Sequence, residues 1–138
     1  MNAVVKRRER IARVRRVQHA QAAAMATAAE LHLSSLEHSE GRLTELRASL
    51  SSATGTFAAE TLASRAELAL RLDEARFGLI PTIDGARATA ELRAAERMEA
   101  RRLQESADRL TERAADAANR LAERRASASP RVERKRGG

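Results

Sequence analysis

The sequence contains no cysteine, tryptophan or tyrosine, and only two phenylalanines. Without cysteine the chain can form neither a disulfide framework nor a zinc knuckle, and it has no thiolate for catalysis. Because aromatic side chains supply much of the buried area of a compact core, we do not expect a thick globular core. Two prolines and six glycines in 138 residues leave little room for strands and loops.

Long apolar runs are also absent. No stretch of about 18 apolar residues occurs, so the sequence predicts no transmembrane segment. The basic residues near the N-terminus are followed by the largely polar stretch 17–21 instead of an apolar run, which argues against a secretory signal. We therefore expect a cytoplasmic protein.

The residues that are present favour helices. Charged residues make up 33% of the chain and hydrophobic residues 43%, with much of the latter being alanine. A bias toward Ala, Glu, Leu and Arg with helical spacing is typical of long helices and coiled coils. Low hydrophobicity combined with net charge can also indicate disorder. Leucine recurs too regularly for disorder over most of the chain, so the sequence predicts an all-α protein.

One uncharged stretch of small residues, 51–56, divides the helical pattern. It includes Gly55, which can adopt the positive φ that closes a helix end. We predict a long antiparallel two-helix coiled-coil hairpin over residues 1–128, with its turn at this stretch. Its first arm is expected at about 3–50 and its second at about 57–127, followed by a disordered basic tail at 129–138.

The second arm contains Gly78 and Pro81, and apolar periodicity continues through both. A proline inside a helix removes one hydrogen bond, but a kinked helix often tolerates it. We therefore predict a kink near Pro81. The alternative makes Gly78–Gly85 the loop of the hairpin.

Apolar residues at heptad spacing predict the seam between the arms. In the first arm they fall into two frames that differ in phase by four residues near His32, which predicts a stutter. The first frame contains Val4, Ile11, Val14, Met25 and Ala28, with Gln18 and Gln21 as polar members. The second frame contains Leu36, Leu43, Leu46, Leu50, Ala53 and Phe57. In the second arm the predicted seam residues are Leu68, Leu72, Ala75, Leu79, Ile83, Ala86, Leu92, Leu103, Leu110, Ala114, Ala117 and Leu121.

No catalytic pattern is found. The three histidines, His19, His32 and His38, lack the one-turn spacing to a second ligand that makes a helical metal site, although His32 is expected at a seam position. No serine has a G-x-S-x-G context, and no glycine-rich phosphate loop occurs. We therefore predict a protein without enzymatic activity, metal or cofactor.

The net charge of +7 is unevenly distributed. Residues 1–20 contain seven basic side chains and one acidic one, whereas residues 21–60 are acidic. The basic segment can be a docking surface for an acidic protein, a nucleic-acid backbone or an anionic membrane, or merely a solvated face. Nucleic acid is disfavoured, because stacking aromatics and known DNA-binding motifs are absent.

The basic and apolar opening at residues 4–15, the long first helix, the small-residue turn and the longer second helix resemble the FliJ family and its YscO relatives. These proteins belong to flagellar and virulence type III export systems. Two departures are visible: aromatics near the turn are reduced to Phe57 and Phe77, and Pro81 interrupts the second helix.

The resemblance implies a monomeric, non-enzymatic stalk that couples an export ATPase ring to the cytoplasmic domain of the export gate, at the periphery of the inner membrane. It leaves open whether the system is flagellar or virulence-related. The ring-facing residues would be Arg7, Arg8, Arg10, Arg13, Arg15, Arg16, Arg124 and Arg125. The gate-facing residues would be Leu43, Leu46, Phe57 and Leu62. The alternatives are a basic helical protein that binds nucleic acid or an anionic membrane, and a purely structural coiled coil.

Overall fold

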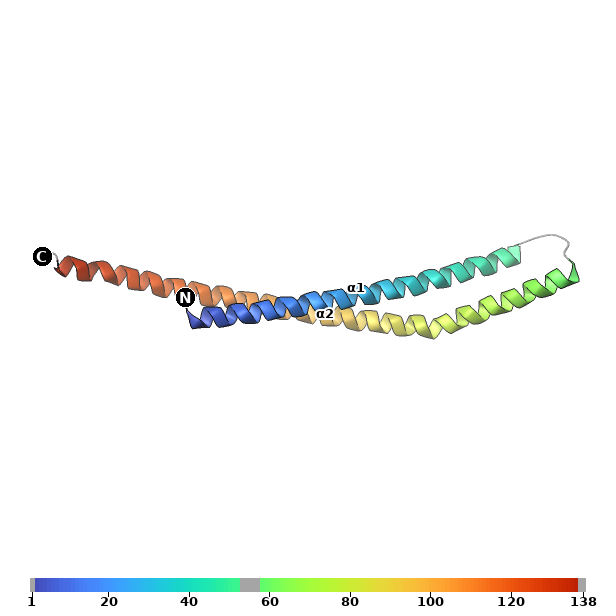
Figure 1. Cartoon of the computed structure of the whole chain (residues 1–138), viewed down its shortest axis with the longest axis horizontal. Coiled ribbons are helices and arrows are strands. Elements are labelled where there is room, and N and C mark those ends of the chain that lie inside the picture. The colour runs from blue at the N-terminus through green and yellow to red at the C-terminus, as the bar shows by residue number, and fades with distance from the viewer. Residues whose placement is uncertain (1, 53–57, 137–138) are drawn as a thin grey trace. The chain divides into compact units, whose positions relative to one another are not determined.

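The computed structural model describes residues 2–52 and 58–136, except for the side chains of 129–136. Two helices account for nearly all of them: α1 (Ala3–Ser52) and α2 (Ala59–Arg136) (Figure 1). The helices are antiparallel and pack against each other, and the described residues contain no strand. The predicted all-α helical hairpin is therefore confirmed.

Helix α2 is continuous through Gly78–Gly85, so the alternative hairpin loop at these residues is wrong. Helix α1 ends at Ser52, and α2 begins at Ala59. Of the predicted turn at 51–56, Ser51 and Ser52 are the last residues of α1, and residues 53–56 lie outside the described residues.

Figure 1 shows α2 bending where its colour passes from green to yellow, in agreement with the kink predicted for this part of the helix. Pro81 lacks the N–H that would bond to the carbonyl four residues earlier, and its ring crowds that carbonyl. The Thr82 hydroxyl donates to the Gly78 carbonyl at 3.3 Å. Pro81 is exposed, whereas Leu79 is half-buried and Ile83 buried, so the packed face of the helix continues past the proline.

The C-terminal end of α2 differs from the prediction. The helix was expected to end near Ser127–Pro130 and to be followed by a disordered tail, but α2 continues to Arg136. One proline removes only one hydrogen bond. The residues after Pro130 are mostly Arg, Lys and Glu, which are good helix formers.

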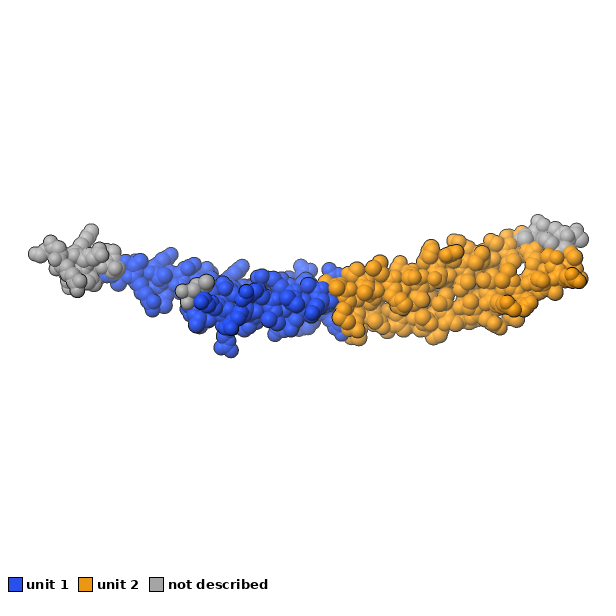
Figure 2. All heavy atoms as spheres, in the orientation of Figure 1, with its two compact units in different colours: residues 1–22, 96–138 blue, residues 23–95 orange. Residues whose placement is uncertain are grey.

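The chain divides into two units, each built from one part of α1 and one part of α2 (Figure 2). Unit 1 comprises residues 1–22 and 96–138, and unit 2 comprises residues 23–95. Among the described residues, the buried ones are Val5, Ala12 and Ala107 in unit 1, and Ala26, Ile83 and Ala86 in unit 2. Four of these six are alanine, so close approach of the helices replaces a thick core.

The inward-facing residues of α1 follow one heptad register from Val5 to Leu50. They recur at alternating spacings of three and four residues, as in a coiled coil. The stutter predicted near His32 is therefore wrong, and His32 itself is exposed. The seam residues of α1 are Val5, Arg8, Ala12, Arg15, His19, Ala22, Ala26, Ala29, Leu33, Leu36, Glu40, Leu43, Arg47 and Leu50.

In the first half of α1 the predicted seam is displaced by one residue. Val4, Ile11, Val14 and Met25 are 54%, 37%, 55% and 46% exposed, and Ala28 is also exposed. At two of these positions the prediction placed the larger residue inside, whereas the helices meet through the smaller neighbours Ala12 and Ala26. In the second half Leu36, Leu43 and Leu50 are half-buried as predicted, but Leu46 is 52% exposed.

Helix α2 has the same regularity. Its seam residues are Arg65, Ala69, Leu72, Arg76, Leu79, Ile83, Ala86, Ala90, Arg93, Ala100, Gln104, Ala107, Thr111, Ala114 and Ala118. The prediction is confirmed at Leu72, Leu79, Ile83, Ala86 and Ala114. It is wrong at Leu68, Ala75, Leu92, Leu103, Leu110, Ala117 and Leu121, all of which are exposed.

Ion pairs between α1 and α2 fix the register of unit 2. Their shortest distances are 3.2 Å for Arg47–Asp73, 3.7 Å for Glu40–Arg76 and 3.5 Å for Glu37–Arg87. In antiparallel helices the residue number rises along one helix as it falls along the other, so the sum of the two numbers of a pair stays nearly constant. The sums for these three pairs are 120, 116 and 124, as expected without a register shift. Polar groups at seam positions lower stability but specify one alignment.

The alanine seam makes a testable prediction at Ala26, which is 1% exposed. Ala26→Leu should lower the free energy of unfolding by about 1–3 kcal/mol, because the added atoms force the helices apart. Ala24→Leu places the same side chain at an exposed position of α1 and should change stability by less than about 0.5 kcal/mol. Chemical denaturation followed by circular dichroism measures both. Equal effects would contradict the observed register.

A second prediction concerns Gly78. A Cβ atom at this position would meet no atom within 4 Å, and the residue is helical. Gly78→Ala should therefore raise the free energy of unfolding by about 0.5–1 kcal/mol. The same denaturation experiment tests it. A loss of stability would indicate a turn that needs glycine, and would contradict the continuous α2.

Candidate functional site

Formal charge differs in sign between the two units. Unit 1 contains 19 Lys and Arg residues against 9 Asp and Glu, which gives +10, whereas unit 2 contains 7 against 10, which gives −3. All the predicted ring-facing residues lie in unit 1: Arg7, Arg8, Arg10, Arg13, Arg15, Arg16, Arg124 and Arg125. An excess of this size attracts acidic partners.

The two flanks of the unit 1 seam differ in chemistry. On one flank Arg16 of α1 lies 3.5 Å from Asp108 of α2, with side chains 59% and 39% exposed. An ion pair this exposed contributes at most about 1 kcal/mol. Its main effect is to neutralise this arginine and to align the two helices.

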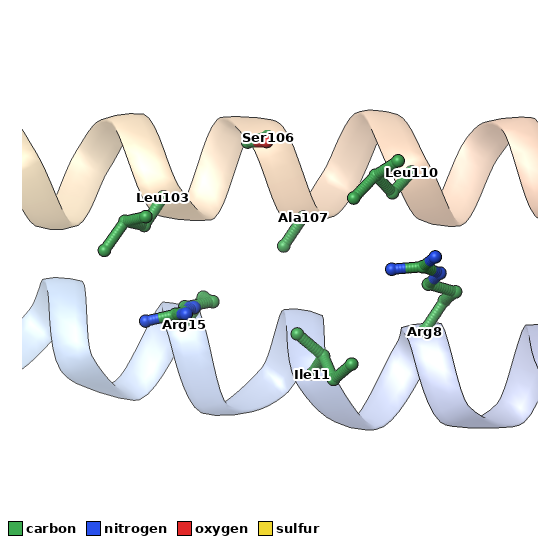
Figure 3. Close-up of a pocket in the computed structure, with 7 residues that line it drawn as sticks. All are labelled: Arg8, Ile11, Arg15, Leu103, Ser106, Ala107 and Leu110. Carbon is green, nitrogen blue, oxygen red and sulfur yellow. The ribbon is translucent and has the colours of Figure 1, made fainter.

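The other flank is a shallow groove. Ile11 of α1 faces Leu103 and Leu110 of α2, and Ala107 lies between these two leucines (Figure 3). Each of the three larger side chains is 37% exposed, whereas Ala107 is 7% exposed. The small alanine forms the floor, and the larger side chains form the two walls. We call this hollow of about 220 Å³ the apolar groove; its remaining lining residues are Arg8, Arg15 and Ser106.

A second hollow extends the apolar groove along α1. The two share Ile11 and Arg15, and Val14 provides a further apolar side chain at 55% exposure. Neither hollow is lined by a carboxylate. The remaining residues of the second hollow are Arg7, Arg10 and Gln18.

The arginines around the apolar groove, and Arg13 on the same helix, keep most of their hydrogen-bonding capacity. Arg15 donates to the Gln18 side-chain oxygen at 3.0 Å. Within the described parts of the chain, the side chains of Arg7, Arg8, Arg10 and Arg13 form no ion pair or hydrogen bond. Each guanidinium presents five N–H donors, so these four side chains can bind carboxylates of a partner.

Arg124 and Arg125 lie on α2 in the same unit, and both are exposed. Arg125 lines a third hollow together with Asn2 and Val5 from the start of α1, and with Leu121 from α2. The structure therefore brings Arg125 next to the first turn of α1. It does not place either residue in the apolar groove.

The predicted gate-facing residues lie in unit 2 or outside the described residues. Leu43 is half-buried in the seam, so most of its surface is already covered. Leu46 and Leu62 are both 52% exposed and are available for contact. Phe57 lies outside the described residues.

The described residues provide neither a metal-binding cluster nor a membrane-spanning helix. No group of three His, Cys, Asp or Glu side chains that could hold a metal ion occurs within residues 2–52 and 58–128. Neither helix, over its described length, is apolar enough to cross a membrane. His19 is a half-buried seam residue, and His32 and His38 are exposed.

The apolar groove was missed by the sequence analysis because Ile11, Leu103 and Leu110 were assigned to the seam. A signal was available: Ala100, Ala107 and Ala114 recur every seven residues. A heptad repeat of alanine marks the closest approach of two helices and moves the neighbouring leucines to the flank.

Comparison of the chain with protein-family models, curated proteins and solved structures finds no match.

The Arg16–Asp108 pair allows a third prediction. In a double-mutant cycle with Arg16→Gln and Asp108→Asn, the coupling should be below about 1 kcal/mol and should fall as salt is added. The Arg47–Asp73 pair, whose side chains are 34% and 35% exposed, should couple more strongly. Urea denaturation at two salt concentrations gives both values. Stronger coupling at Arg16–Asp108 would contradict the exposed geometry.

Proposed function

We propose that this protein is a non-enzymatic coiled-coil adaptor that docks through unit 1 on an acidic surface of a partner protein. The partner we propose is the ATPase ring of a flagellar or virulence type III export apparatus. The adaptor would connect this ring to the cytoplasmic domain of the export gate, in the cytoplasm at the periphery of the inner membrane.

The observation that carries the proposal is the set of unpaired arginines in unit 1. Of the seven basic side chains in the first twenty residues, those of Lys6 and four arginines have no charged or hydrogen-bonding partner among the described residues. Such charges on one unit, with the opposite sign on the other, can orient the protein as it approaches a charged surface. They lie on a helix whose inner face is packed, so their positions are fixed relative to one another.

The choice of an export ATPase is supported by the resemblance to the FliJ family. The basic and apolar residues 4–15 that carry it lie on α1 in unit 1. The second helix is longer than the first, with 78 residues against 50. Leu46 and Leu62 offer exposed apolar surface in unit 2 for a contact with the gate.

The test is binding to the type III export ATPase of the same organism, measured by calorimetry and by ATP turnover. Arg7→Glu with Arg10→Glu should weaken binding by about tenfold or more, because each reversal replaces an attraction with a repulsion. The matched control reverses two exposed arginines of unit 2, Arg42→Glu with Arg71→Glu, and should retain the affinity.

An ATPase that neither binds the unmodified chain nor changes its turnover would overturn the proposed partner. Equal loss in the two double variants would show that net charge matters and not the surface of unit 1. Binding to duplex DNA or anionic vesicles at the same ionic strength, lost only in the unit 1 variant, would support the alternative function of the basic segment.

A further inference from the structure

Unit 1 has two apolar stripes, and the contact between α1 and α2 buries one of them and only partly covers the other. The inner stripe contains the alanines of the seam, such as Ala12 and Ala107. The second lies on the flank and contains Ile11 from α1, with Leu103 and Leu110 from α2. A helix in a bundle of three or more helices has a wider apolar face than a helix in a two-helix coiled coil, whose seam is narrow.

The shape of the apolar groove suits a third helix. Figure 3 shows Ile11 between Arg8 and Arg15 along α1, with Leu103 and Leu110 opposite and Ala107 between them. The walls come from two antiparallel helices and the floor is a small residue. A row of leucine-sized side chains from an added helix could therefore insert over Ala107 and cover the exposed parts of the walls.

The charge of the groove lining determines which kind of helix can bind there. The groove and its extension are lined by Arg7, Arg8, Arg10 and Arg15, and by no carboxylate. Of these arginines only Arg15 bonds to a side chain within the described residues. A helix with acidic residues beside its apolar stripe would pair with them, whereas a basic helix would be repelled.

The same charges disfavour a second copy of unit 1 as the occupant. A two-fold interface would place the same patch of each copy against the other. The four arginines would then face four identical arginines without intervening carboxylates, which is unfavourable.

We propose that the apolar groove of unit 1 binds an acidic amphipathic helix of a partner protein. This helix packs as a third helix on Ile11, Leu103 and Leu110. This rests on the proposed docking role of unit 1, and not on the partner being an export ATPase. The arginines provide recognition, and the apolar walls provide the buried contact.

The probe for this proposal is a synthetic peptide of about three heptads, with leucine at the a and d positions and glutamate at e and g. Fluorescence anisotropy with the full chain should show saturable binding that weakens as salt is added. A peptide with lysine in place of glutamate should bind at least about tenfold more weakly.

Variants of the full chain locate the site. Ile11→Ser with Leu110→Ser should reduce the affinity for the acidic peptide about tenfold or more. The control is Leu31→Ser with Leu70→Ser, at exposed leucines of unit 2, and it should bind as the unmodified chain does. Arg7→Gln with Arg10→Gln changes only exposed side chains, so it provides a second test if the serine variant unfolds.

Cross-linking tests the docked position, because the chain has no cysteine of its own. Ser106→Cys, in the groove lining, should form a disulfide with a peptide that carries one cysteine beside its leucine stripe, in a buffer in which oxidised glutathione is the oxidant. Glu112→Cys, an exposed position outside the groove lining, should react much less.

Any of three results with the peptides would overturn the proposal. The first is that the acidic peptide does not bind, and the second is that the lysine peptide binds as tightly as the acidic one. The third is that the serine variants of unit 1 and unit 2 reduce the affinity equally. A dimer in sedimentation that dissociates on Ile11→Ser with Leu110→Ser would also overturn it, since a second copy would then occupy the groove. If the peptide fails but an export ATPase still binds through the arginines, the proposed function stands and the third helix does not.

Discussion

The close approach of α1 and α2 through alanine is the constraint on which the rest of the structure depends. Ala12, Ala26, Ala86 and Ala107 are the small side chains that the helices bury between them. Side chains of this size contribute little apolar area each, so stability accumulates over a long seam. Regular heptad spacing on both helices keeps that seam aligned.

This seam decides where every other side chain lies. Because the small side chains of Ala12 and Ala107 occupy buried seam positions of unit 1, the larger Ile11, Leu103 and Leu110 are left on one flank. The Arg16–Asp108 ion pair lies on the other flank. One flank therefore has a neutralised ion pair and the other has apolar side chains with arginines beside them. Such a helix pair has a defined face for a partner, which a uniformly solvated coiled coil lacks.

The sequence was sufficient to predict the all-α hairpin and the kink near Pro81, because heptad spacing and the missing N–H of proline depend on residues that are close together in the sequence. It also placed the charged segment correctly on α1. It failed for the register, since Ile11 and Ala12, or Met25 and Ala26, are neighbours and residue size favoured the wrong member of each pair. The apolar groove depends on that one-residue difference, and the alanine repeat at 100, 107 and 114 was the sequence signal that indicated it.

The most direct measurement of the central claim is the labelling rate of single cysteines at two neighbouring positions of α1. Ile11 is 37% exposed and Ala12 is 1% exposed. A thiol reagent should label Ile11→Cys at least about tenfold faster than Ala12→Cys in the folded chain, because the buried thiol reacts only after local opening. Faster labelling of Ala12→Cys would place Ile11 in the seam and would contradict the alanine seam and the apolar groove together.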